Sequence, residues 1–227
     1  MKAVVVLSGG QDSATALALA TRRHGAGEVA AITYHYGQRH AVEVRYARRL
    51  AKRFGVVAHK LVRLDFYRTL TDNALFDPTA KIRRKRGASC PTTVVEGRNA
   101  VFLQLAAVWA KTLGATEVWT GVSEADFSGY PDCRAAFIRA QEKAIRLALD
   151  YPVRIVTPFM RKTKAQEWEL AAKLGIFEVI RDETVTCYEG VPGEGCGKCP
   201  ACRLRARGLK EFLRLRRGAC ARRENMR

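Results

Sequence analysis

The stretch with the clearest chemical potential is the sequence SGGQDS at residues 8–13. A run of β-branched and apolar residues precedes it and an alanine-rich segment follows it, which predicts a strand, a tight loop and a helix. The two glycines lack the Cβ atoms that would keep a ligand away from the backbone, so successive amides can converge on an anion at the positive end of the helix. We therefore expect a phosphate-binding loop made of Leu7, Ser8, Gly9, Gly10, Gln11, Asp12 and Ser13.

This loop differs from two common nucleotide-binding loops. It lacks the Gly-Lys-Ser/Thr ending of a Walker loop and the G-x-G-x-x-G spacing of a dinucleotide site, which disfavours γ-phosphate hydrolysis and hydride transfer. It resembles the Ser-Gly-Gly-x-Asp-Ser loop of the ATP pyrophosphatase superfamily, whose members cleave ATP between its α and β phosphates. The alternative is a Gly-Gly turn that binds nothing, but a bare turn does not need Ser, Asp and Ser around its glycines.

A second group of reactive side chains lies near the end of the chain, where four cysteines have the spacing C-x8-C-x2-C-x2-C. Four thiolates can close a tetrahedral shell around zinc, and a metal without an open coordination position is structural rather than catalytic. An iron–sulfur cluster is the alternative, because C-x2-C-x2-C also occurs in ferredoxins. The expected metal ligands are Cys187, Cys196, Cys199 and Cys202, whereas Cys90, Cys133 and Cys220 are expected to be structural or incidental thiols.

Acidic residues gather in a polar loop at residues 123–132. Carboxylates suit the ring N–H and amino donors of a guanine-like base, a tyrosine ring can stack on a flat heterocycle, and an arginine can pair a carboxylate at two points. A loop kept acidic for solubility and helix capping is the alternative. The candidate residues for binding a base are Glu124, Asp126, Tyr130, Asp132 and Arg134.

The elements expected to position these loops form one α/β domain. Strands are predicted at residues 2–7, 28–36, 56–64, 117–122 and 153–157, and helices at residues 14–24, 41–54, 99–114, 133–149 and 164–174. The strands are nearly continuous apolar runs, which indicates a doubly wound, five-stranded, parallel, Rossmann-like sheet covered on both faces. With strand order 3-2-1-4-5, the loops after strands one and four face each other across the crevice in which ligands bind.

Two further segments complete the predicted organisation. Residues 65–97 show no strong period and are interpreted as an irregular excursion, in which residues 81–97 could close over the site as a lid. Residues 1–182 are expected to form the ATP-binding domain. Residues 183–227 are expected to form a small appendage that contains the cysteine cluster and a basic C-terminal helix.

The net charge of the chain gives only general information about its binding partners. The formal net charge is +18, concentrated in residues 81–86 and 203–227. Such charge attracts nucleic acid and phosphate-rich ligands without conferring specificity, and a solvated basic face is the simpler interpretation. Only a short apolar run follows Lys2, and no apolar run approaches the ~20 residues that span a bilayer. We expect a cytoplasmic protein that needs neither nucleic acid nor a membrane.

Five motifs taken together resemble the 7-cyano-7-deazaguanine synthase family, which makes a precursor of queuosine and archaeosine. They are SGGQDS at residues 8–13, YGQRH at 36–40, EGRN at 96–99, GVSEADFSGYPDCR at 121–134, and the four-cysteine tail. The resemblance runs from residue 2 to about residue 213, and it implies the adenine nucleotide alpha hydrolase type of α/β fold. One departure is Glu96, which stands where the family commonly has proline.

The resemblance implies an ATP-dependent ligase that converts 7-carboxy-7-deazaguanine and ammonia to 7-cyano-7-deazaguanine. The carboxylate would be adenylated and ammonia would displace AMP to give an amide. A second adenylation would give the amide oxygen a leaving group, so that loss of AMP yields the nitrile. Mg²⁺, structural zinc and a homodimer are also implied. The catalytic residues that we assign on this basis are Ser8, Asp12, Ser13, Arg98 and Asp132, with Arg98 or Arg134 contacting the substrate carboxylate or the phosphates.

Two other classes of function remain open from the sequence. The basic surface and the spare cysteines would also suit a tRNA-modifying sulfurtransferase or a lysidine-type ligase of the same superfamily. A zinc-knuckle module that binds nucleic acid without catalysis would show tight, salt-sensitive binding and no ATP turnover. The intact phosphate-binding loop argues against that last class.

Overall fold

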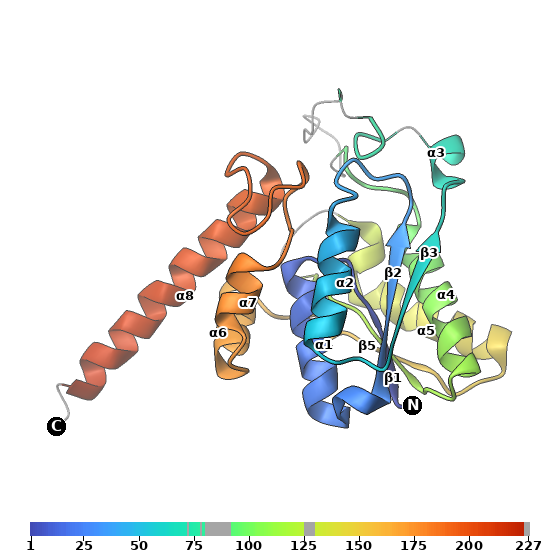
Figure 1. The fold of residues 1–227 in the computed structure, drawn as a ribbon, viewed down its shortest axis with the longest axis horizontal. Coiled ribbons are helices and arrows are strands. Elements are labelled where there is room, and N and C mark those ends of the chain that lie inside the picture. Colours follow the sequence, from blue (N-terminus) through green and yellow to red (C-terminus); the bar gives the residue numbers. More distant parts are fainter. Residues whose placement is uncertain (72, 78, 80–91, 125–129, 225–227) are drawn as a thin grey trace.

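The computed structural model describes residues 1–71, 73–77, 79, 92–124 and 130–224, and side chains up to residue 218. Its sheet has five parallel strands in the order β3-β2-β1-β4-β5, which confirms the predicted topology (Figure 1). The reversal of strand order therefore lies between β1 and β4. The strands are β1 (Ala3–Val6), β2 (Val29–His35), β3 (Ala58–Arg63), β4 (Glu117–Trp119) and β5 (Arg154–Val156).

Burial along the strands explains why their sequences are nearly continuous apolar runs. The central strands β1, β2 and β4 are buried along almost their whole length, whereas the edge strands β3 and β5 are only partly buried. Successive residues of β1 enter different cores: Val4 packs on one face of the sheet, and Ala3 and Val5 pack on the other. Both faces are therefore covered, as parallel sheets require.

Helices form the layers on the two faces of the sheet (Figure 1). On one face, α4 (Arg98–Thr112) and α5 (Ala135–Leu149) contribute Leu103 and Ile145 to the core. On the other face, the core side chains come from α1 (Gln11–His24), α2 (Glu43–Arg53) and α6 (Lys164–Lys173); they include Leu17, Leu50 and Trp168.

Two boundaries near the predicted crevice differ from the sequence-based prediction. Helix α1 begins at Gln11, three residues before the predicted start, so Asp12 and Ser13 belong to its first turn. Strand β4 ends at Trp119 rather than at residue 122. Gly121 packs so closely on α1 that a Cβ atom there would lie 2.8 Å from the carbonyl carbon of Asp12, so the chain leaves the sheet at this point. The loops after β1 and β4 are thus in contact.

Several short elements were not predicted. They are α3 (Tyr67–Leu70), within the segment interpreted as irregular, and α7 (Phe177–Asp182), together with 3-10 turns at Ala26–Glu28 and Pro131–Cys133. Each is too short to show a hydrophobic period in the sequence. The basic run at residues 81–86 and the greater part of the predicted lid lie outside the described residues.

The C-terminal helix α8 (Pro200–Glu224) packs against α6 and α7 and then extends away from the sheet (Figure 1). The indole N–H of Trp168 donates to the carbonyl oxygen of Arg205 at 3.3 Å, and the rings of Phe177 and Phe212 lie 5.9 Å apart. Gly208 allows this approach, because a Cβ atom there would lie 2.3 Å from the Cβ of Lys164. The predicted basic helix is present, and the domain division at residue 182 stays a prediction.

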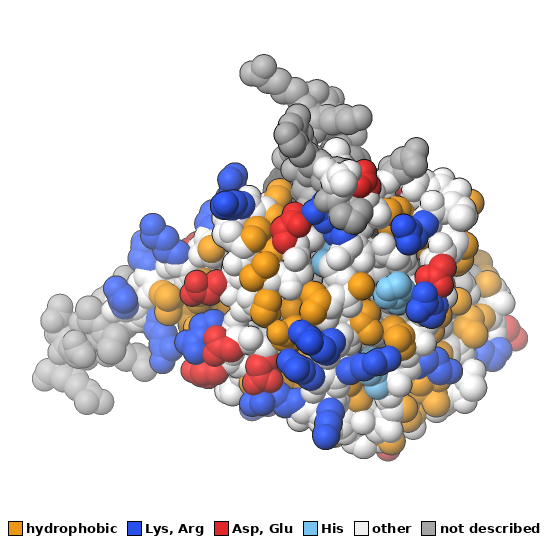
Figure 2. All heavy atoms as spheres, turned by 45° about the horizontal axis from the view of Figure 1, so that its top comes forward, with side chains coloured by type: hydrophobic (Ala, Val, Ile, Leu, Met, Phe, Trp, Pro, Cys, Tyr) orange, Lys and Arg blue, Asp and Glu red, His pale blue; other side chains and the backbone are white. Residues whose placement is uncertain are grey.

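On the face seen in Figure 2, lysine and arginine side chains are separated by apolar and acidic side chains. Many of the exposed cations belong to α2, where Arg45, Arg48, Arg49, Lys52 and Arg53 alternate with the residues that pack on the sheet. Among the helices of the described residues, none has the length and apolarity needed to cross a bilayer.

Candidate active site

The loop after β1 is held closed by its two serines. The backbone N–H of Ser8 donates to the hydroxyl of Ser13 at 3.1 Å, the two hydroxyl oxygens lie 3.0 Å apart, and the Ser13 hydroxyl donates to the carbonyl of Gly10 at 3.1 Å. Gly10 stands at the N-cap of α1 and provides no side-chain cap. The amides at the positive end of α1 are therefore not satisfied by a capping side chain of their own helix, as an anion site requires.

Gly9 brings this loop into direct contact with α2. Its φ of +89° lies in the left-handed region, which side chains disfavour. A Cβ atom at this position would also lie 2.5 Å from the carbonyl oxygen of Glu43 and 3.0 Å from the backbone nitrogen of Ala47. Only glycine fits here, for two independent reasons.

A segment near the C-terminus also lies against the loop. We call residues 184–190 the strap. The backbone N–H of Val185 donates to the carbonyl of Gly9 at 2.9 Å, and the backbone N–H of Gln11 donates to the hydroxyl of Thr186 at 3.3 Å. The Gln11 side-chain amide is buried and has no hydrogen-bond partner within the described part of the chain. The strap therefore forms one wall of the loop.

A buried charged cluster adjoins the first turn of α1. The ammonium group of Lys164 donates to the Asp12 carboxylate at 2.7 Å and to the two carboxyl oxygens of Glu167 at 3.1 and 3.0 Å. Lys164 and Glu167 are buried, whereas the Asp12 side chain is one third exposed, at 33%. Lys164 thus places its ammonium group beside the first turn of α1.

The two carboxyl groups of this cluster have opposite protonation preferences. Burial raises the pKa of Glu167 well above its usual range, and the charge of Asp12 raises it further. Burial also acts to raise the pKa of Asp12, but the Lys164 ammonium and the hydrogen bond from Glu167 outweigh it, so that this pKa lies below its ordinary value. Folding therefore favours the ionised form of Asp12 and the protonated form of Glu167.

We expect Glu167→Gln to be tolerated, because glutamine resembles a protonated carboxyl group. The change in the free energy of unfolding at pH 7 should be within about 1 kcal/mol. A pKa that is raised by folding stabilises the protein fully below the unfolded-state pKa, near 4.3, and this contribution is lost as the pH rises through the folded-state pKa. The wild type should therefore lose stability relative to Glu167→Gln as the pH rises above about 4.3, as measured by urea unfolding at several pH values.

Glu169→Gln is the matched control for this prediction. Glu169 lies on the exposed side of the same helix and pairs with Lys173 at 2.6 Å. Its replacement should change stability by less than about 0.5 kcal/mol at every pH. If Glu167→Gln instead becomes less stable than the wild type as the pH rises, Glu167 is ionised in the folded protein.

Across the sheet, Arg98 is the first residue of α4, and Asp132 lies in the 3-10 turn Pro131–Cys133 next to it. A guanidinium nitrogen of Arg98 donates to the hydroxyl of Tyr36 at 2.8 Å. A carboxylate oxygen of Asp132 accepts from the backbone N–H of Asn99 at 2.9 Å, while its second oxygen is buried and has no partner among the described residues. Asp132 therefore orders the residue next to Arg98, and one carboxylate oxygen is left for a ligand or a water.

The other predicted base-binding residues are in several different environments. The Tyr130 hydroxyl lies 2.5 Å from the hydroxyl of Thr93 and 3.1 Å from that of Tyr188. Glu124 accepts from the backbone N–H of Ala135 at 3.1 Å and so caps α5, which is the alternative role considered for this loop. The side chain of Arg134 is exposed, and Asp126 lies outside the described residues. The substrate roles of these residues stay predictions.

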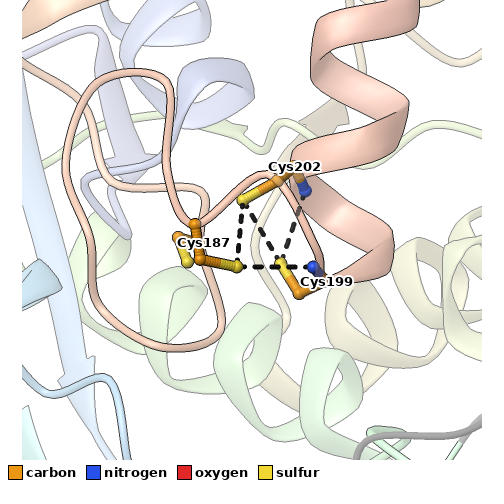
Figure 3. A group of neighbouring side chains, drawn as sticks. Cys187, Cys199 and Cys202 are labelled. Atoms are coloured by element: carbon orange, nitrogen blue, oxygen red, sulfur yellow. Dashed lines mark hydrogen bonds between the residues drawn. The ribbon is translucent and has the colours of Figure 1, made fainter.

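The four cysteines come together at the start of α8, and their sulfur atoms all lie within 4.8 Å of one another. Figure 3 shows the sulfurs of Cys187, Cys199 and Cys202 pointing toward a common point. The sulfur of Cys202 lies 3.9 Å from that of Cys196 and 3.3 Å from that of Cys199. A tetrahedral zinc ion with Zn–S bonds of ~2.3 Å would place its sulfurs about 3.8 Å apart.

The surroundings of the sulfurs also fit a metal ion. Backbone N–H groups of Lys198 and Cys199 point at the sulfur of Cys196 at 3.4 Å each. Burial acts to raise the pKa of Cys196, but these amides outweigh it and lower the pKa to about 7, whereas burial raises the pKa of Cys199 and of Cys202. A Cβ atom on Gly195 would lie 2.3 Å from the sulfur of Cys202, so this turn leaves no space for a side chain. The donor set is thus closed, as in a structural site.

Sequence reasoning missed four residues of this region: Lys164, Glu167, Thr186 and Arg205. A signal for Lys164 was present, because it opens the helix after the fifth strand and so lies at the same edge of the sheet as residues 8–13. The other three have no such signal. Their positions depend on how the strap and α8 pack, which no local pattern encodes.

The fold and the loop after β1 together define an open parallel α/β protein with a glycine-containing loop between its first strand and first helix. A family model described as "Queuosine biosynthesis protein QueC" matches residues 2–213. Because this match spans nearly the whole chain, the chain belongs to that family, the 7-cyano-7-deazaguanine synthases. The resemblance predicted from the sequence motifs is confirmed.

The solved structures that match this chain include three synthetases. NMN synthetase from Francisella tularensis matches with a TM-score of 0.50 and 17% identity over 86% of this chain and 70% of that chain. NH3-dependent NAD synthetase from Campylobacter jejuni has a TM-score of 0.47 and 16% identity over 78% and 67%. A 4-thiouridine synthetase, solved with RNA and bound ATP, has a TM-score of 0.46 and 20% identity over 79% and 42%. The first of these similarities supports the fold alone.

Proposed function

We propose that this protein is the ATP-dependent ligase that converts 7-carboxy-7-deazaguanine and ammonia to 7-cyano-7-deazaguanine, releasing AMP and pyrophosphate. Membership of the queuosine biosynthesis family supports the pathway. The observation that carries the proposed chemistry is the start of α1, where the N-cap Gly10 has no capping side chain, closed by Ser8 and Ser13 and flanked by the buried Lys164. This arrangement offers amides and a fixed cation to a leaving diphosphate.

In the first half of the reaction a carboxylate oxygen of the substrate attacks the α phosphorus of ATP. An acyl adenylate forms, and pyrophosphate leaves. The amides of residues 8–13 and the ammonium of Lys164 bind the departing charge, so no covalent nucleophile on the protein is needed. Ammonia then adds to the activated carbonyl carbon, and AMP departs with one of the former carboxylate oxygens.

In the second half the amide oxygen attacks the α phosphorus of a second ATP. The amide nitrogen loses its protons as the C–N bond becomes triple, and the second AMP carries away the remaining oxygen. The same loop serves both halves, because the same α–β bond is broken each time. Mg²⁺, when bound with ATP, supplies further positive charge to the phosphates. Asp12, which stays ionised, fits such a cation.

We assign the base-binding role to the loop after β4 and the start of α4. Tyr130 offers a ring for stacking, and Asp132 retains one buried carboxylate oxygen without a partner among the described residues. Arg98 is held by Tyr36 and lies on the same helix start, where it suits the substrate carboxylate or the phosphates. Glu124, Asp126 and Arg134 complete the proposed set, and a homodimer in the cytoplasm is the proposed state of the protein.

For the cysteine cluster we propose a structural zinc ion. The four thiolates would hold it, and none of the reaction steps passes through it. Zinc would stabilise the fold of residues 187–202, because three ligands come from one short turn and the fourth comes from the strap.

The direct test is turnover by purified protein with its metal content measured. The carboxylic acid, ammonia and Mg-ATP should yield the nitrile and two AMP per nitrile, without any tRNA. One zinc per chain in a colourless preparation should accompany this activity. Release of ADP would contradict cleavage between the α and β phosphates, and a strict requirement for tRNA would favour a tRNA-modifying enzyme instead.

A further inference from the structure

The cysteine cluster and the phosphate-binding loop share one segment of chain. Three of the four cysteines lie between residues 196 and 202, but Cys187 lies in the middle of the strap. A metal ion bound to all four sulfurs would therefore tie the strap to the start of α8. Cys187 is flanked directly by the strap residues that contact the active site.

On one side of Cys187 the strap contacts the phosphate-binding loop. Val185 donates to the carbonyl of Gly9 at 2.9 Å, and the hydroxyl of Thr186 accepts from the backbone N–H of Gln11 at 3.3 Å. A Cβ atom on Gly10 would lie 3.4 Å from the carbonyl oxygen of Val185, so the two segments are in van der Waals contact. Any movement of the strap would change the positions of the loop amides.

On the other side of Cys187 the strap contacts two more parts of the proposed site. The hydroxyl of Tyr188 lies 3.1 Å from that of Tyr130, on the proposed base-binding loop. The ring of Tyr188 lies 6.0 Å from that of His40, just after β2. Glu189 pairs with Arg39 at 2.7 Å. The strap thus spans the proposed site from the phosphate side to the base side.

Arg205 of α8 anchors the strap through hydrogen bonds. It lies on α8, three residues after Cys202, and is almost fully buried, with 4% of its surface exposed. One guanidinium nitrogen donates to the hydroxyl of Thr184 at 2.7 Å and to that of Thr186 at 3.1 Å. The other donates to the backbone carbonyls of Ile180 and Arg181. Of these two threonines, Thr186 also contacts the phosphate-binding loop.

We propose that Thr186 is a positioning residue through which the metal centre sets the affinity of the loop for nucleotide. A bound metal would fix the position of Cys187 and therefore that of Thr186, its neighbour in the chain. The Thr186 hydroxyl would then fix the position of the Gln11 amide, the first of α1. Because coupling between two binding sites is reciprocal, nucleotide should also favour retention of the metal. The inference rests on the proposed function in taking ATP as the ligand of this loop.

The test is the affinity for Mg-ATP, measured by equilibrium dialysis without the acid substrate, for zinc-loaded and zinc-depleted protein. Zinc removal should weaken ATP binding by about fivefold or more in the wild type. In Thr186→Val the zinc-loaded protein should already bind ATP about fivefold more weakly, and zinc removal should have a much smaller further effect. Circular dichroism of each sample checks that the sheet and helices are intact.

Thr184→Val is the matched control, because the Thr184 hydroxyl shares the bond to Arg205 but, among the described residues, has no hydrogen bond to the loop. It should respond to zinc as the wild type does. Equal ATP affinity with and without zinc in the wild type would overturn the inference, as would a zinc response in Thr186→Val equal to that of the wild type. Absence of any ATP binding by the zinc-loaded wild type would instead refute the proposed function.

Discussion

Replacement of Gly9 by alanine is expected to reduce ATP-dependent AMP formation by at least about 100-fold. The left-handed backbone at φ +89° costs a side chain about 1–2 kcal/mol. The added methyl group would also meet the carbonyl oxygen of Glu43 at 2.5 Å, so either the loop or α2 must move. Displacement of the loop amides by a fraction of an ångström removes the geometry that binds the departing diphosphate. Initial rates of AMP release measure the effect.

Gly25→Ala is the matched control for Gly9→Ala. Gly25 also has a left-handed φ, of +86°, but a Cβ atom there would have nothing within 4 Å. Its replacement should lower the free energy of unfolding by about 1–3 kcal/mol, because its φ of 86° and ψ of 143° are rarely adopted by residues with a side chain, and leave the rate per folded molecule unchanged. Equal activity of Gly9→Ala and Gly25→Ala would mean that the loop after β1 does not contact the nucleotide.

Lys164→Met is expected to reduce the rate of AMP formation by about 100- to 1,000-fold. It removes the cation beside the loop at the moment when negative charge develops on the leaving diphosphate. It also leaves the Asp12 carboxylate without the ammonium group that contacts it at 2.7 Å, which should cost about 1–3 kcal/mol of stability because a third of this side chain is exposed to solvent. Lys173→Met on the exposed part of α6 is the control. It should change neither the rate of AMP formation nor the stability appreciably.

A double variant separates the catalytic role of Lys164 from its structural role. Lys164→Met combined with Glu167→Leu removes the buried charge and its buried partner together, and Asp12 retains access to solvent, with 33% of its side chain exposed. Stability should recover in part, because an apolar pair of similar size replaces two buried polar groups whose desolvation is unfavourable. Activity should stay low. Recovery of activity together with stability would show that Lys164 only supports the fold.

The topology of the sheet could be predicted because local pattern and global fold agree. Strands β1, β2 and β4 are buried on both faces, so their apolar residues form continuous runs, and Gly25 and Gly114 mark the ends of helices. The anion loop and the cysteine cluster were also predictable, because each is a short run of fixed spacing whose chemistry does not depend on the rest of the chain.

Contacts between segments that are distant in the sequence could not be predicted. Thr186 and Arg205 are an ordinary threonine and arginine in the sequence, and only the packing of α8 against α6 brings them to the loop. Glu124 shows a different limit, because the sequence left both base binding and helix capping open; the structure shows it capping α5, and its base-binding role stays a prediction. Polar residues in loops can serve either purpose, and spacing alone does not distinguish them.

The most direct measurement of the central claim uses substrate acid labelled with ¹⁸O at both carboxyl oxygens. If the carboxylate and then the amide each attack the α phosphorus at the loop after β1, mass spectrometry should find two AMP per nitrile. Each AMP should carry one ¹⁸O in its phosphate, and the pyrophosphate should be unlabelled. Label in inorganic phosphate or in water, with AMP unlabelled, would contradict activation of the substrate by adenylation.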